Sequence, residues 1–103
     1  MKACEARVLA ALLESGGGTF RSIARWCGRT SRTNVAMRVS ALRDLRLVSV
    51  AVPHKRGRRG HPARFAPTEA AWRWAERLAR GDECDRFHVL GQIVEALEAR
   101  EGG

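Results

Sequence analysis

The apolar residues of this chain change their spacing near Leu47. Before that point they recur every three or four residues, which is typical of amphipathic helices. From Leu47 to Val52 they alternate with small residues, which is typical of a strand with one buried face. Residues 53–62 (PHKRGRRGHP) have no apolar side chain beyond the prolines, and residues 63–66 follow as a second short strand with Phe65 pointing inward. The pattern predicts a helical body that carries a two-stranded hairpin with a protruding basic loop.

Three helices are predicted before the hairpin. The first covers residues 3–14 and ends at a Ser-Gly-Gly-Gly turn. The second covers residues 20–27 with Thr19 as its N-cap, and the third begins after the N-cap Ser31 and runs to about residue 45. A short helix and a second helix joined by a tight Gly-containing turn form a helix-turn-helix arrangement. The residues expected on the buried faces are Val8, Leu9, Leu12, Leu13, Phe20, Ile23, Ala24, Cys27, Val35, Val39 and Leu42.

Two helices are predicted after the hairpin. Thr68 caps the first, which covers residues 69–80, and Asp82 caps the second, which covers residues 83–100. The second carries apolar residues at spacings of three and four, as does a helix that packs on another helix. The expected core face of the first is Ala71, Trp74, Ala75 and Leu78, and the stripe of the second is Phe87, Leu90, Val94 and Leu97.

The order of elements over residues 3–80 resembles a winged helix-turn-helix DNA-binding domain. Residues 23–48 are similar to the core of MarR-, ArsR- and PadR-type prokaryotic transcriptional regulators, and the stretch GRRGHPARFAPTE resembles their wing and the start of the next helix. The chain departs from the family pattern at Arg46, where a Gly often stands, and at Pro67, where a Leu is usual. The resemblance implies an α+β, mostly α fold, in which a three-helix core and a two-stranded β wing are followed by one or two C-terminal helices.

The charge is divided unevenly along the 103 residues. Nineteen Lys and Arg stand against eleven Asp and Glu, which gives a formal charge of +8. Residues 1–66 hold fourteen basic and three acidic residues, a net +11, whereas residues 67–103 hold five and eight, a net −3. A basic body followed by a mildly acidic end indicates a polyanion-binding part and a separate, non-binding element. Double-stranded DNA is the polyanion that we expect.

The resemblance also implies which residues touch DNA. The third helix would enter the major groove, with Arg32, Thr33, Asn34, Met37 and Arg38 contacting base edges. Four fixed charges in residues 55–59 repel one another, and insertion at a narrow minor groove would compensate that repulsion. The candidate backbone or minor-groove contacts are Thr19, Arg21, Arg25, Arg29, Thr30, Lys55, Arg56, Arg58, Arg59 and His61. For both groups the alternative is an ordinary solvated surface.

The last predicted helix is acidic, which suits a protein partner better than DNA. Residues 1–80 would form the winged helix DNA-binding domain and residues 81–103 a C-terminal helix for dimerisation. A homodimer would read a pseudo-palindromic site, with an interface formed by Phe87, Leu90, Val94 and Leu97. The alternative is that this helix packs on the first helix within a monomer. A pocket for any small-molecule effector would lie between the winged body and the terminal helix.

Several other classes of site are not expected. Cys84 and His88 could share a metal if they lie one helical turn apart, but two ligands do not make a site, so we predict no metal and no cofactor. Three widely separated cysteines argue against a disulfide framework. Trp26 and Trp72 are expected to pack against the terminal helix rather than to stack on single-stranded bases. No catalytic constellation or membrane-spanning segment is recognised, so we expect a non-enzymatic, soluble protein that is cytoplasmic and nucleoid-associated.

These observations favour a dimeric DNA-binding transcriptional regulator that acts as a repressor by occlusion. Three alternatives stay open. One is an architectural or chromatin-type protein that binds duplex DNA with little sequence preference. The second is a winged-helix module that binds proteins, and the third is RNA binding.

Overall fold

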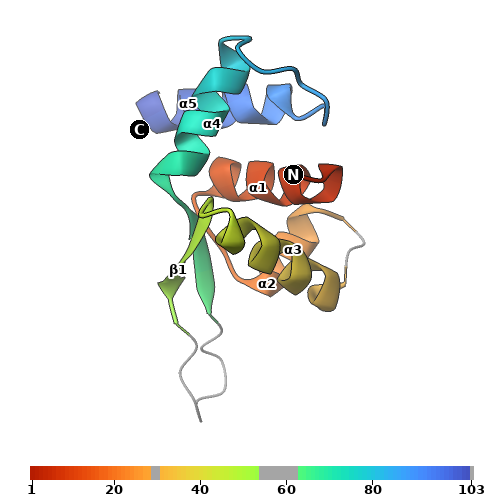
Figure 1. Ribbon diagram of the computed structural model, residues 1–103. Helices are drawn as coiled ribbons and strands as arrows, with labels where there is room; N and C mark the ends of the chain where they lie inside the picture. The colour runs from red at the N-terminus through yellow and green to blue at the C-terminus, as the bar shows by residue number, and fades with distance from the viewer. Residues whose placement is uncertain (29–30, 54–62, 103) are drawn as a thin grey trace.

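The computed structural model describes residues 1–28, 31–53 and 63–102 (Figure 1). This part of the chain holds five helices and one antiparallel pair of strands, so the prediction of an α+β, mostly helical fold is confirmed. The basic loop predicted at residues 53–62 lies outside the described residues from position 54 on. The elements are α1 (Ala3–Ser15), α2 (Phe20–Trp26), α3 (Arg32–Asp44), β1 (Val48–Val52), β2 (Arg64–Pro67), α4 (Glu69–Ala79) and α5 (Leu90–Gly102).

The first three helices begin and end close to where their capping residues predict. The α1 helix ends at Gly16, whose φ of 83° is a left-handed conformation that glycine adopts without a Cβ clash. At the start of α2 the Thr19 Oγ1 accepts a hydrogen bond from the Ser22 amide at 3.2 Å. At the start of α3 the Ser31 Oγ accepts one from the Asn34 amide, also at 3.2 Å. These bonds satisfy amides that a helix leaves unpaired at its N-terminus.

The hydrophobic core lies where α1 is covered on several sides. The α1 helix packs on α3, α5 and β2, and α2 packs on α3. The side chains expected at the buried faces of α1, α3 and α4 are all buried, as are Ile23 and Ala24 of α2. Phe20 and Cys27 are half-buried and pack against this core from its edge.

The hairpin joins the core only at its base. The β1 and β2 strands are antiparallel, with Val50 opposite Phe65, and Gly18 pairs with Phe65 on the other side. Phe65 is buried as predicted and stacks on Phe20 with 4.7 Å between ring centroids. Val48 is 3% exposed but Val52 is 46% exposed, so the expectation of a buried face along the whole of β1 is wrong. The strand runs past the helices that would cover it (Figure 1).

The segment after α4 differs most from the prediction. The α4 helix has its expected bounds, but α5 begins at Leu90 and not at residue 83, and Asp82 does not cap it. Residues 80–89 form a connection in which Gly81 has a φ of 81°. The Asp85 carboxylate accepts hydrogen bonds from the Val89 amide at 3.0 Å and the Leu90 amide at 3.1 Å. The helix start is therefore fixed by an acidic side chain five residues upstream.

The two tryptophans of the sequence prediction have different environments. Trp72 is half-buried, and the Arg100 guanidinium of α5 lies over its ring at 4.4 Å from the centroid, so packing against the terminal helix is confirmed. Trp26 is 45% exposed and lies against the backbone at Gly18, where a Cβ would come within 2.8 Å of its ring. The prediction is wrong for Trp26, because α2 turns this side chain toward the α1–α2 connection.

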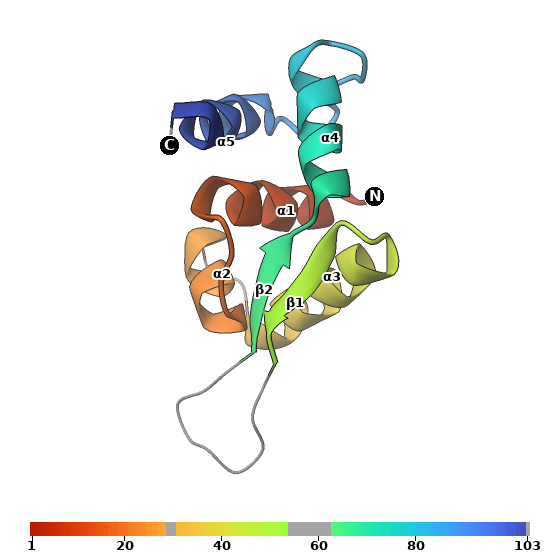
Figure 2. The same ribbon diagram turned by 90° about the vertical axis from the view of Figure 1, so that its left-hand side faces the viewer.

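The elements divide between two ends of the molecule. The α4 and α5 helices lie on one side of α1, and α2, α3 and the hairpin lie on the other (Figure 2). The α5 helix packs on both α1 and α4, and Ile93 and Ala96 are its buried residues. This layout places α4 and α5 on the opposite side of α1 from the described ends of β1 and β2.

Candidate nucleic-acid interface

The α2 and α3 helices pack against each other and are separated by a short connection. Gly28 follows the end of α2 with a φ of 85°, so the chain turns in the left-handed region at this point. Arg29 and Thr30, two of the expected backbone contacts, lie outside the described residues. Ser31 then caps α3, which fixes where that helix begins.

The α3 helix has one buried side and one open side. Val35, Val39 and Leu42 are buried against the core. On the opposite side Thr33, Met37 and Ser40 recur at spacings of four and three and are all exposed. Met37 is 67% exposed, although a methionine side chain ordinarily favours burial. This side of α3 is a helical surface that the described elements leave uncovered.

The five residues expected to contact bases do not all lie on the open side of α3. Thr33, Asn34 and Met37 are exposed. Arg38 is half-buried on the flank of α3 that faces α2, close enough for its charge to act on the Cys27 thiol. Arg32 begins the helix, and its side chain is outside the described part of the structure.

The pKa of the Cys27 thiol depends on burial and on the nearby positive charges at this flank of α3. Burial raises the pKa of Cys27 above its ordinary value of 9.0, because a thiolate is poorly solvated there. The positive charges of Arg38 and Arg7 act in the opposite direction and lower it. Desolvation is the larger effect, so the thiol stays protonated at neutral pH.

The expected phosphate-contacting residues are partly described. Arg21 and Arg25 are exposed and lie one turn apart on α2. Thr19 is half-buried, and its hydroxyl accepts the Ser22 amide as a helix cap. The remaining members of the set, Lys55, Arg56, Arg58, Arg59 and His61, lie outside the described residues.

Two exposed residues of this region are not among the candidate DNA contacts predicted from the sequence. Ser40 lies on the open side of α3, two helical turns after Thr33, as the helical repeat predicts, but it is not among the expected base contacts. Arg64 begins β2 and is exposed opposite Val52, at the end of the strand pair that lies away from the core. Its alternation with the buried Phe65 could have placed it on the outer face of the strand.

The ion pairs of the described chain are concentrated at the other end of the molecule. Arg77 pairs with Glu83 at 3.5 Å, Arg80 with Asp82 at 3.6 Å, and Arg100 with Glu69 at 2.7 Å. All six residues belong to α4, α5 or their connection. Within residues 1–28, 31–53 and 63–102, no ion pair involves Arg21, Arg25 or Arg64. The exposed cations of the α2 and β2 region therefore have no internal counter-charge there.

The residues expected at a dimer interface are half-buried. Phe87 precedes α5, so it is not part of the helical stripe that the sequence predicts. Leu90, Val94 and Leu97 lie on α5 beside the fully buried Ile93, and each keeps part of its surface exposed. Packing of α5 on α1, the alternative considered from the sequence, does occur within this chain.

The Cys84 and His88 pair is not arranged as a helical metal site. Both residues lie in the connection before α5, so the spacing of one helical turn is wrong. In the described ranges no group of three His, Cys, Asp or Glu side chains is close enough to hold a metal ion.

Comparisons with protein-family models, curated proteins and solved structures find no significant match. None of the helices in the described part of the chain is long and apolar enough to cross a membrane.

Proposed function

We propose that this protein is a DNA-binding transcriptional regulator with a winged helix-turn-helix fold. The observation that carries the proposal is the open side of α3, where Thr33, Met37 and Ser40 are exposed beside the hairpin end of the molecule. An α-helix fits the major groove of B-DNA, and only a helix with an uncovered side can enter it.

The open side of α3 has the chemistry for reading bases. The Asn34 amide can donate to and accept from adenine, and the methyl groups of Thr33 and Met37 can contact a thymine methyl. Arg38 lies on the flank, where its guanidinium can reach either a guanine or a phosphate while its stem packs against the core. Three kinds of base contact are thus available within two turns of one helix.

The uncompensated arginines support a phosphate-contacting role. Arg21 and Arg25 on α2 and Arg64 on β2 are exposed on elements that pack around the core of α1 and α3. Phosphate contacts of this kind position a domain on the duplex without reading its sequence. The basic residues 55–59 add charge to the same hairpin and are proposed to lie at the minor groove.

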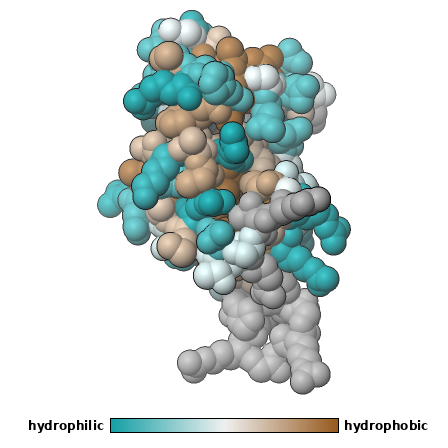
Figure 3. Space-filling model, turned by 90° about the vertical axis from the view of Figure 1, so that its right-hand side faces the viewer, coloured by the Kyte–Doolittle hydropathy of each residue, from teal (hydrophilic) through white to brown (hydrophobic). Residues whose placement is uncertain are grey.

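The opposite end of the molecule is suited to a second copy of the chain. Its acidic residues would repel DNA, and Figure 3 shows the most strongly hydrophobic side chains of this face gathered at this end, above a surface of mixed character. Phe87, Trp74 and Leu78 line a groove of about 440 Å³ there. A twofold dimer through this end, including Val94 of α5, would read a pseudo-palindromic site and repress by occlusion.

Selection of bound duplexes from a random pool tests this function directly. The selected site should bind at least a thousandfold more tightly than random duplex at physiological salt. Asn34→Ala should weaken binding of the selected site by about 1–3 kcal/mol and leave binding to random duplex unchanged. Arg64→Gln should weaken both and lower the salt slope by about 1. Arg73→Gln, which removes an exposed arginine of α4, is the matched control and should change neither.

Two results would contradict the proposal. If no duplex is bound at low salt, the DNA-binding function is wrong and a protein-binding module becomes the better interpretation. If selected and random duplexes bind equally across the salt titration, the protein is an architectural binder and not a specific regulator.

A further inference from the structure

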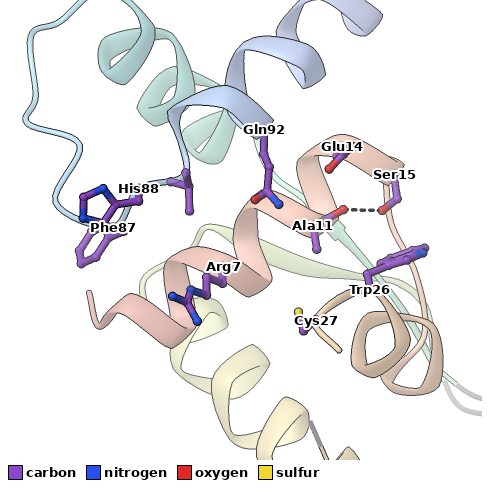
Figure 4. Close-up of a pocket in the computed structure, with 10 residues that line it drawn as sticks. Arg7, Ala11, Glu14, Ser15, Trp26, Cys27, Phe87, His88 and Gln92 are labelled. Carbon is purple, nitrogen blue, oxygen red and sulfur yellow. Dashed lines mark hydrogen bonds between the residues drawn. The ribbon is translucent and has the colours of Figure 1, made fainter. Parts of the chain in front are cut away.

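A cleft lies along α1, on a side of the helix that neither α3 nor the hairpin covers (Figure 4). One wall is the end of α2 with Trp26 and Cys27, and the other is the segment from Phe87 to Gln92 that leads into α5. Its volume is about 560 Å³, which is within the range of small-molecule sites. The open side of α3 contributes no residue to this lining.

The two ends of the cleft carry opposite charge. Arg7 and Glu14 both project from α1 and are seven residues apart, so they lie on one side of the helix about 10 Å apart along its axis. Both side chains are exposed, and neither forms an ion pair with any residue in the described ranges. The cleft therefore has a cationic end and an anionic end with no internal neutralisation.

Each end of the cleft also carries an aromatic side chain. Figure 4 shows Phe87 and His88, whose imidazole can donate a hydrogen bond, toward the same end as Arg7. It shows Trp26, whose ring can attract a cation through its π face, toward the same end as Glu14, with Ser15 between the two in this view. The two ends therefore offer different groups to a ligand. Arg7, Phe87 and His88 are available at one end, and Glu14 and Trp26 at the other.

The middle of the cleft is of mixed character. Ala11 forms part of its floor, Val89, which is almost fully buried, forms part of a wall, and the Gln92 amide projects toward Ala11 (Figure 4). The Cys27 thiol faces this region (Figure 4) and is half-buried. An apolar stem can lie here without separating a charged group from water.

We propose that this cleft binds an elongated zwitterionic small molecule. Its oxyanion group, such as a carboxylate, lies at Arg7, and its ammonium group lies between Glu14 and the Trp26 ring. A stem of about 10 Å, set by two turns of α1, separates the two charges. The guanidinium supplies a charge-assisted hydrogen bond at one end, and the carboxylate and indole supply attraction at the other. The site does not depend on the proposed DNA-binding function.

Linear ω-amino acids are suitable probes because only their length varies. Titration of the isotopically labelled full chain, followed by NMR, should show saturable shifts at the cleft residues with 8-aminooctanoate. 4-Aminobutanoate, which cannot span about 10 Å, should bind at least tenfold more weakly. The methyl ester and the N-acetyl derivative of 8-aminooctanoate each lack one charge and should also bind more weakly.

Charge-removing variants assign the two ends. Arg7→Gln should weaken 8-aminooctanoate binding by about tenfold and abolish the preference for the acid over its methyl ester. Glu14→Gln should abolish the preference for the amine over its N-acetyl derivative. Both positions are exposed, so neither change should unfold the protein, and circular dichroism checks this. Glu98→Gln on the exposed side of α5 is the matched control and should leave binding unchanged.

Two outcomes would overturn the proposal. One is the absence of saturable shifts at the cleft with any probe. The other is binding that responds to neither substitution, or that octanoate without the amine reproduces with equal strength. DNA binding is measured separately on the unliganded protein, so failure of one proposal is distinguishable from failure of the other.

Discussion

Arg46 has a φ of 61°, in the left-handed region that L-residues other than Asn and Asp rarely adopt. It follows the end of α3, where the Leu47 amide donates to the Leu42 carbonyl at 3.0 Å and the Arg46 amide donates to the Arg43 carbonyl at 2.9 Å. This pair of bonds is a Schellman motif, in which glycine is preferred at the position of Arg46. The glycine of the resembled regulators therefore has a conformational reason, and this chain retains the conformation without the glycine.

Arg46→Gly should stabilise the protein. The substitution removes left-handed backbone strain of about 1–2 kcal/mol. The larger conformational entropy of glycine in the unfolded chain cancels part of this gain, so we expect the free energy of unfolding to rise by about 0.5 kcal/mol. Urea denaturation measures the change in the free energy of unfolding. Arg43→Gly removes the same charge within the helix and should destabilise by about 0.5–1 kcal/mol. Equal effects of the two variants would contradict this explanation.

The Cys27 thiol should react slowly with alkylating reagents. Its raised pKa lowers the thiolate fraction, and thiolate is the reactive form. In variants that keep one cysteine each, iodoacetamide at pH 8 should modify Cys27 at least about tenfold more slowly than the exposed Cys84. The two rates should converge in concentrated urea, and a difference that persists there would not come from the fold.

The raised pKa of Cys27 also makes the free energy of unfolding depend on pH. A thiol whose pKa is raised by folding is protonated in both states below its ordinary pKa of 9.0. As the pH rises above 9.0, the unfolded chain loses its proton first, so the stabilisation is lost progressively. Cys27→Ser should therefore flatten the decline of stability with pH on the alkaline side.

At the scale of elements, the start of α3 depends on one side chain. Ser31→Ala removes the acceptor of the Asn34 amide and should lower the free energy of unfolding by about 1 kcal/mol. Ser31→Asp restores an acceptor and should recover most of that loss. If alanine and aspartate give the same midpoint in urea denaturation, the cap does not contribute to stability.

The helices with local start and stop signals were predictable, and the last one was not. Thr19, Ser31 and Thr68 immediately precede helices, and Gly16 and Gly28 come just after helix ends. The stripe from Phe87 to Leu97 has helical spacing, but the first three residues of that stretch, 87–89, do not form a helix. Asp85 bonds the amides of residues 89 and 90 and so fixes a later start. A side chain that caps from five residues upstream has no short-range sequence signature.

The candidate site was predictable only in outline. The helical repeat of the apolar residues in α3 predicts which side of the helix is buried. The opposite side, with Thr33 and Met37, is therefore predicted to be open. The half-burial of Arg38 depends on where α2 packs, and the exposure of Trp26 depends on how the α1–α2 connection passes. Tertiary packing decides these positions, as it also decides that the cleft forms beside α1.

At the scale of the whole molecule, the end formed by α4 and α5 should mediate dimerisation. Val94 is half-buried and lies outside the core cluster of the described chain, so Val94→Glu should convert a dimer to a monomer without lowering the unfolding midpoint measured at a concentration where the wild-type chain is also monomeric. Light scattering at about 100 μM, well above the dissociation constant of a micromolar dimer, measures the change. Ala96→Glu, at a buried position, should instead unfold the protein. A wild-type chain that is monomeric at that concentration would contradict the dimer.

The concentration of ion pairs at one end, with uncompensated arginines at the other, gives the molecule an electric dipole. In the field of a highly charged polyanion such a dipole experiences a torque before any contact is made. On the proposed DNA-binding function, we expect the protein to approach with α2 and the β1–β2 pair leading and its C-terminal helices trailing. We then expect a larger fraction of collisions to begin in a productive orientation, so that the charge separation raises the association rate more than the lifetime of the complex.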